Sequence, residues 1–144
     1  MRLLKITSLH VFFPLLLGGI IYICFRSTSL RLFKWLEILG LKSEALSIRN
    51  IIQPLKNELP TWTYFSLPDG LWVYSLSSAL IILWGDQFKY WLIIPLLFGV
   101  FIEFAQKIKI FPGTFDIIDF IFSVSALVLS IIILKRKTKI VSHC

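Results

Sequence analysis

The sequence has little charge: only 16% of its 144 residues are Asp, Glu, Lys or Arg, where soluble domains average about 25%. Its residues are 57% hydrophobic, and the mean hydropathy is +0.83. This combination excludes an ordinary soluble domain and predicts an integral membrane protein. Cysteine is also scarce. Cys24 and Cys144 fall on opposite sides of the membrane in the topology derived below, which excludes a disulfide between them within one chain.

Motifs for common cofactors are missing as well. The sequence has no zinc-binding spacing, no P-loop and no dinucleotide-binding glycine pattern, so no cofactor is evident. A net charge of +7 would suggest nucleic acid in a soluble protein. Here the basic residues lie at the chain ends and in loops, where anionic headgroups are the expected partner. We therefore expect membrane lipids, and not nucleic acid, as partners.

What the sequence does contain is four apolar stretches long enough to cross a bilayer as helices. They are residues 9–25, 67–84, 90–106 and 115–134. A cleaved signal peptide is the alternative for the first stretch, but no small-x-small cleavage site precedes Arg26. The predicted fold class is an all-α membrane protein forming one domain over residues 1–144. It has four transmembrane helices plus an interfacial amphipathic helix in the first outer loop.

That outer loop, residues 26–66, is the largest segment outside the predicted spans. An amphipathic helix is expected at about residues 30–40, because three charged residues recur every third position on an apolar helix (Arg31, Lys34 and Glu37). Such a stripe is typical of a helix lying in the membrane interface, and packing against the other helices is the alternative. A second helical piece is expected over residues 43–53.

The starts of the spans carry further expectations. Pro68 suits the first turn of the second span, and Asp69 suits the positive end of its helix dipole. His10 is expected to lie near the cytoplasmic interface and to have no functional role. A seam of mostly small residues on the second span and a seam of small residues on the fourth predict close helix packing. The seams comprise Ser75, Ser78, Ala79 and Ile82, and Ser123, Ala126 and Ser130.

With four spans, both termini lie on the same side of the membrane. The terminal side carries seven Lys and Arg residues and the other side eight, so the count alone does not decide the orientation. The seven lie in shorter segments close to helix ends, which is where orientation is set. We therefore expect the N-terminus and the C-terminus to be cytoplasmic.

The candidate functional site consists of two polar pairs that flank a Pro-Gly turn. Glu103 and Gln106 are three residues apart, and Asp116 and Asp119 repeat this spacing, so each pair shares a helix face. The pairs are symmetric about Phe111. If the turn joins two antiparallel helices, Glu103 lies at the depth of Asp119. This arrangement predicts a polar site just beneath the outer surface.

Carboxylates at this depth have a limited set of roles. On insertion scales a carboxylate facing lipid at mid-membrane costs about 2.5–3.5 kcal/mol, so these groups are expected to face inward. They could share a proton, or bind a hard divalent cation together with Gln106, Asp116 and Asp69. Either arrangement could perform acid–base chemistry on a headgroup entering from the outer leaflet.

Each residue also has a simpler structural interpretation. Asp116 could stabilise a helix start with Thr114 as the cap. Glu103 could pair with Lys107 one turn later, and Gln106 could hydrogen-bond across helices. For Asp116 alone we favour the structural role. For Glu103 and Asp119 together we favour a functional one, because intramembrane ionisable residues are functional by default.

Residues 67–134 resemble the VanZ-like family of small bacterial membrane proteins, whose founding member is linked to teicoplanin resistance. The resemblance rests on Glu103-x-x-Gln106, then Pro112-Gly113-Thr114-Phe115-Asp116-x-x-Asp119. Family members show a similar E-x-x-Q, a turn, and a D-x-x-D that opens the last helix. Asp69 falls where relatives carry a polar residue, often His. The chain departs from the pattern at Phe115, where relatives usually have Arg, and at Ser123 and Ser125, where they often have Asn and Gly.

The resemblance implies a cell-envelope role in the bacterial inner membrane, around lipid-linked or glycan-bearing molecules. It does not imply an enzyme, and no catalytic residue is assigned. We therefore expect the protein to bind or handle a cell-envelope lipid or polar headgroup. One alternative is a membrane-embedded enzyme, with or without metal assistance, acting on a lipid-linked substrate. The other is a non-catalytic subunit of a larger complex with a membrane protein partner.

Overall fold

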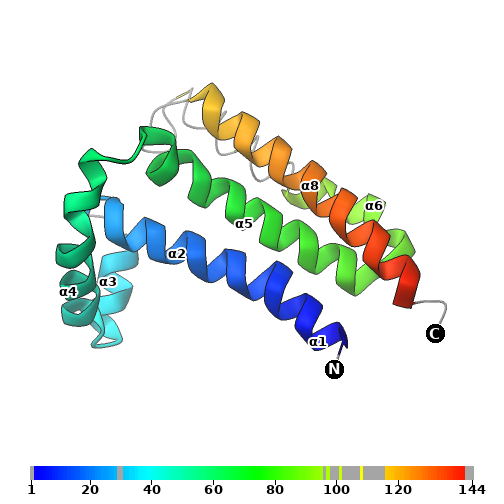
Figure 1. The fold of residues 1–144 in the computed structure, drawn as a ribbon, viewed down its shortest axis with the longest axis horizontal. Coiled ribbons are helices and arrows are strands. Elements are labelled where there is room, and N and C mark those ends of the chain that lie inside the picture. The colour runs from blue at the N-terminus through cyan, green and yellow to red at the C-terminus, as the bar shows by residue number, and fades with distance from the viewer. Residues whose placement is uncertain are drawn as a thin grey trace.

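The computed structural model describes residues 2–28, 31–95, 97, 101, 108 and 116–141, and every element in these ranges is helical (Figure 1). Three helices in these ranges are long and apolar enough to cross a membrane: Leu3–Phe25, Thr61–Trp84 and Ile117–Lys135. This is compatible with a multi-pass membrane protein. The predicted third span, residues 90–106, is described only at residues 90–95, 97 and 101. The 3-10 helix η3 (Gly85–Gln87) precedes it, and α6 (Phe88–Trp91) overlaps its first two residues.

The first span is a helical rod made of α1 (Arg2–Thr7), the π-helix η1 (Ser8–Phe12) and α2 (Phe13–Phe25). In the π-turn the N–H of Phe13 donates to the carbonyl of Ser8, five residues back. Pro14 follows directly, and a proline has no N–H for the carbonyl four residues earlier and its ring would clash with that carbonyl in a regular α-helix, so the wider turn relieves this clash. The membrane-length stretch begins at Leu3 and not at residue 9, because Leu3, Leu4 and Ile6 continue its apolar composition.

The central helix of the bundle is α5 (Thr61–Trp84). Half of its apolar window is buried by protein, against 28% for the first span and 17% for the last. It starts at Thr61, so the predicted start at residue 67 was wrong. Pro68 accordingly lies inside the helix and not in its first turn. The proline removes one backbone donor, which membrane helices tolerate when neighbouring helices surround the site, and Pro68 is fully buried.

Two glycines mark places where neighbouring helices approach each other closely, one between α2 and α5 and one between α5 and α8. A Cβ on Gly18 of α2 would lie 2.7 Å from Nε1 of Trp72, and a Cβ on Gly70 would lie 3.3 Å from the carbonyl oxygen of Phe122 in α8 (Ile117–Val141). Four residues of the expected seams are buried: Ser75 is 3% exposed, Ser78 and Ser130 are 0% exposed and Ala126 is 9% exposed. Ser75 donates to the carbonyl of Val11 and so faces η1, and the close approach of α5 to α8 is at Gly70, which belongs to neither seam. Packing of the two seams against each other stays a prediction.

The direction of the three long helices follows from their neighbours. At one end of the bundle a cluster of buried and partly buried residues brings together Ile6, Ile81, Phe88 and Leu134. Since Gly70 lies beside Phe122 at the other end, α5 and α8 run in the same direction while α2 runs opposite to them (Figure 1). Residues 85–116 must therefore carry the chain from the end of α5 back to the start of α8.

The first loop forms a helical hairpin of α3 (Arg31–Ile38), α4 (Lys42–Ile52) and the 3-10 helix η2 (Gln53–Asn57). The structure thus contains helices at both predicted places in the loop. Gly40, with φ of 72°, ends α3. The N–H of Leu41 donates to the carbonyl of Leu36 and the N–H of Gly40 to that of Glu37, at 2.8 and 3.1 Å. This is a Schellman motif. A location of α3 in the membrane interface stays a prediction.

The hairpin crosses the C-terminal end of α2 (Figure 1) and satisfies its last carbonyls. Arg49 of α4 donates to the carbonyl of Ile23 at 3.0 Å and also to that of Arg26. Gln53 donates to the carbonyl of Cys24 at 3.2 Å. A helix end leaves such carbonyls without intrahelical partners, and its dipole favours a cation there. The hairpin is therefore attached to the membrane bundle by polar contacts as well as by packing.

Candidate functional site

Asp116 caps α8. Its Oδ1 accepts a hydrogen bond from the N–H of Ile118 at 2.9 Å, and its carbonyl accepts one from the N–H of Asp119 at 3.1 Å. A carboxylate in this position satisfies an unpaired N–H and complements the positive end of the helix dipole. The structural role predicted for Asp116 is therefore present. Thr114, the predicted cap, lies outside the described residues.

Asp119 lies one turn further into α8 and is half-buried. Its Oδ1 is buried and accepts no hydrogen bond in the described part of the chain. Leaving a buried acceptor unsatisfied costs about 1–3 kcal/mol, and more for a charged group. Asp116 therefore has a local structural task, whereas Oδ1 of Asp119 has no hydrogen-bond partner among the described residues, although the two acids are only three residues apart.

Asp69 of α5 pairs with Arg26, the residue that follows α2. Oδ2 of Asp69 lies 3.9 Å from Nη2 of Arg26, and the two side chains are 34% and 27% exposed. The guanidinium also lies over the rings of Phe65 and Tyr22, 4.9 and 5.4 Å from their centroids. The expectation that Asp69 occupies the positive end of a helix dipole was wrong, because α5 begins at Thr61 and places Asp69 in its third turn.

Asp69 and Asp119 belong to the same end of the bundle. Gly70 follows Asp69 and packs against Phe122, and Phe122 lies one turn after Asp119. Asp69 lies one residue before Gly70 and Asp119 three residues before Phe122, so the two acids are about half a helical turn, roughly 3 Å, apart along the bundle axis. The structure places Arg26, Asp69, Asp116 and Asp119 at this end. Glu103 and Gln106 lie outside the described residues, so their place beside Asp119 stays a prediction.

Sequence reasoning overlooked Arg26 as a site residue. Its Nε is buried and has no hydrogen-bond partner in the described part of the chain, so the guanidinium retains a donor. A planar guanidinium held against aromatic rings is well suited to bind phosphate or carboxylate. The signal that could have identified it is its position, as the first charge after the first apolar stretch.

A metal site is not assembled by the described residues alone, since no group of three His, Cys, Asp or Glu side chains among them could hold an ion. The donors expected for a divalent cation are Glu103 and Asp119 together with Gln106, Asp116 and Asp69, and Glu103 and Gln106 are not among the described residues. The predicted cation site therefore lies partly outside the described residues.

A second polar group lies in the other half of the bundle. His10 of η1 is buried at 7% exposure, and its Nδ1 shares a hydrogen bond of 2.7 Å with the hydroxyl of Tyr74. Beside it, the hydroxyl of Ser75 donates to the carbonyl of Val11 at 2.8 Å. His10 was expected to be a passive interfacial residue. His10 is buried and joins the π-helix to α5 through its bond with Tyr74, so it has a structural role that the sequence analysis did not anticipate.

The described residues therefore define a helical protein with three membrane-length helices, and with three acids and one arginine at the same end of the bundle. Comparison of the chain with protein-family models, with curated proteins and with solved structures finds no match.

Proposed function

We propose that the protein binds the polar headgroup of a cell-envelope lipid at the end of the bundle that carries Arg26, Asp69 and Asp119. The observation that supports this most directly is the buried Oδ1 of Asp119, which has no hydrogen-bond partner in the described part of the chain. A headgroup hydroxyl or amine would supply the missing donor. The unused Nε donor of Arg26 supports an anionic component, such as a phosphate, in the same headgroup.

In this proposal Glu103 and Asp119 are the central acids and share a proton or a cation at one depth. Gln106, Asp116 and Asp69 orient the headgroup, and Arg26 holds its phosphate. The resemblance to the VanZ-like family supports the choice of an envelope lipid over other polar ligands. A bacterial inner-membrane location, with both termini cytoplasmic, belongs to the same proposal.

A fourth crossing by residues 90–106 is part of the proposal too. Two facts support it: the stretch is apolar, and the chain must return along the bundle between α5 and α8, which run in the same direction. An antiparallel return would bring Glu103 towards the start of α8, where Asp119 lies.

The experiment replaces both central acids by their amides, Glu103→Gln with Asp119→Asn, which preserves shape and removes charge. The protein is purified in mild detergent, and its co-purifying lipids are identified by mass spectrometry. We expect loss of at least one class of headgroup-bearing lipid at unchanged membrane abundance. Glu58→Gln, an exposed acid in the outer loop, is the matched control and should retain every lipid class.

Other outcomes separate the alternatives. Unchanged lipid content in the double variant would contradict the proposal. A loss of protein abundance together with lipid would assign the acids to helix packing, as a non-catalytic subunit requires. Accumulation of a chemically altered lipid with the wild-type protein, absent with the variant, would indicate an enzyme instead.

A further inference from the structure

The end of the bundle opposite Asp119 gathers basic residues from three elements. Ile6, Phe88 and Leu134 lie in one cluster of buried and partly buried side chains. Each of them is adjacent in sequence to a lysine with an exposed side chain: Lys5, Lys89 and Lys135. Packing of the apolar cluster therefore brings three cations to this end of the bundle.

Most of the net positive charge of the chain lies at this same end of the bundle. The segments at this end contain seven basic residues, namely Arg2, Lys5, Lys89, Lys135, Arg136, Lys137 and Lys139, and one acid, Asp86. Seven less one gives a net charge of +6, out of +7 for the chain. The remainder of the chain, with eight basic and seven acidic residues, is nearly neutral. The excess of positive charge therefore lies almost wholly at the end formed by α1, α6 and the last turns of α8.

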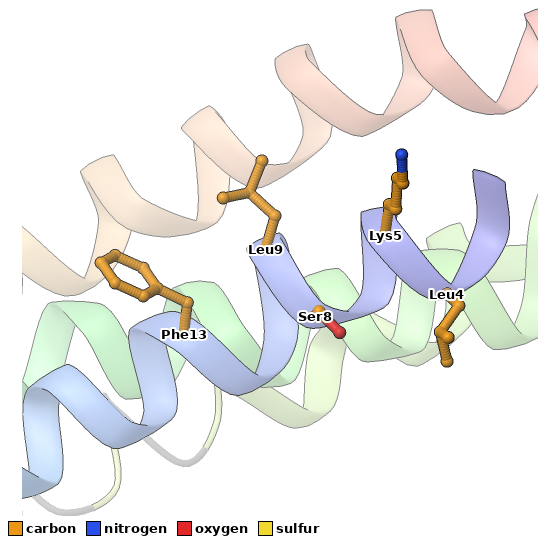
Figure 2. Close-up of a pocket in the computed structure, with 5 residues that line it drawn as sticks. All are labelled: Leu4, Lys5, Ser8, Leu9 and Phe13. Atoms are coloured by element: carbon orange, nitrogen blue, oxygen red, sulfur yellow. The ribbon is translucent and has the colours of Figure 1, made fainter. Parts of the chain in front are cut away.

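An open groove of about 490 Å³ lies at this end, lined by Leu4, Lys5, Ser8, Leu9 and Phe13 (Figure 2). Lys5, Leu9 and Phe13 follow one another at four-residue intervals and project from the same side of the N-terminal helix. Leu9 and Phe13 are 56% and 58% exposed. The groove thus has an apolar wall in the membrane span and an ammonium group near the end of the bundle.

We propose that this groove is a binding site for an anionic phospholipid. One acyl chain lies along Leu9 and Phe13, and the phosphate lies at Lys5, within the field of the other cations. Charge complementarity favours an anionic lipid as the occupant. A net charge of +6 contributes little to the binding free energy of a zwitterionic headgroup, whereas each nearby Lys or Arg contributes about 1 kcal/mol to that of an anionic headgroup. The site lies at the opposite end of the bundle from the proposed headgroup site and does not depend on it.

The experiment measures lipid retention by native mass spectrometry of the full chain. The protein is incubated with phosphatidylglycerol or with phosphatidylcholine carrying the same acyl chains. We expect the wild-type protein to retain more phosphatidylglycerol than phosphatidylcholine. Lys5→Gln should lower phosphatidylglycerol retention roughly fivefold, the factor that corresponds to one nearby cation. It should leave phosphatidylcholine unchanged.

The matched control is Lys56→Gln, because Lys56 lies over the ring of Tyr64 in the other half of the molecule. It should leave phosphatidylglycerol retention unchanged. A second variant, Ser8→Phe, fills the groove without altering charge and should also lower retention of phosphatidylglycerol. Equal retention of the two lipids by the wild type would overturn the proposal. So would equal losses for Lys5→Gln and Lys56→Gln, which would indicate a non-specific effect of surface charge.

Discussion

Arg26 and Asp69 form an ion pair with a separation of 3.9 Å between the end of α2 and the third turn of α5. Tyr22 and Phe65, one from each helix, place their rings against the same guanidinium. Arg26 therefore joins two membrane-length helices and at the same time places a cation beside Asp69, the one acid of α5. Its position makes it both a packing residue and the candidate phosphate ligand.

Arg26→Met should destabilise the protein more than Asp69→Asn, because it removes two cation–π contacts as well as the ion pair. Each such contact is worth about 0.5–1 kcal/mol at exposed sites. The pair itself is about one-third exposed, so a double-mutant cycle should give a coupling energy of about 0.5–1 kcal/mol. Chemical unfolding of the four proteins in detergent measures both quantities. Equal costs for the two single variants would show that the aromatic rings contribute nothing.

Arg49→Met should release the α3–α4 hairpin from the end of α2. The change leaves the carbonyls of Ile23 and Arg26 without the donor that they now share, at a cost of about 1–3 kcal/mol. Hydrogen exchange should accelerate over residues 42–57 before it changes in α5. Lys42→Met is the control, because its 2.9 Å ion pair with Glu37 is solvent-exposed and such pairs contribute only about 0–1 kcal/mol. Similar exchange in both variants would contradict the capping role.

Gly18 and Gly19 provide a matched pair of substitutions. A Cβ on Gly18 would meet Trp72 at 2.7 Å, whereas a Cβ on Gly19 would meet no atom within 4 Å. Gly18→Ala should therefore destabilise the protein by about 1–3 kcal/mol through overpacking. Gly19→Ala should be neutral, or stabilising by about 0.5–1 kcal/mol. Thermal unfolding in detergent compares them, and a reversed order would mean that α2 does not pack against α5 at Trp72.

Substitutions at Asp116 distinguish a helix-capping role of this residue from a role in binding a ligand. Asn is as good a cap as Asp, so Asp116→Asn should preserve stability, while Asp116→Ala should cost about 1 kcal/mol. If Asp116 also orients a headgroup through its charge, Asp116→Asn should reduce lipid co-purification without a loss of stability. Normal lipid content in Asp116→Asn would restrict the residue to its structural role.

The sequence allowed the membrane helices to be predicted but not their exact limits. Apolar composition alone located the three helices observed, because burial in lipid requires it along the whole span. The start of α5 was placed too late because Pro68 was interpreted as a helix start, whereas its neighbours on α2 bury it within the helix. The hairpin helices were anticipated because charge recurs at helical spacing in α3.

Sequence spacing predicted only those parts of the candidate site that lie within one short segment of the chain. The spacing of Asp116 and Asp119 is visible in the sequence, and it placed both at the start of the last helix, as observed. The pairing of Arg26 with Asp69 depends on how α2 packs against α5, so no spacing in the sequence reveals it. The bond between His10 and Tyr74 was missed for the same reason, since the π-turn that rotates His10 towards α5 has no signal beyond Pro14.

The most direct test of the central claim is the proximity of residues 103 and 119. In a background of Cys24→Ala and Cys144→Ser, the pair Glu103→Cys and Asp119→Cys is treated in membranes with a short bifunctional maleimide, and the products are mapped by peptide mass spectrometry. The pair His10→Cys and Tyr74→Cys, whose native side chains are hydrogen-bonded at 2.7 Å, verifies that the reagent reaches the bundle. We predict an intramolecular cross-link between positions 103 and 119. A cross-link in the control pair but none between these two positions would contradict the account.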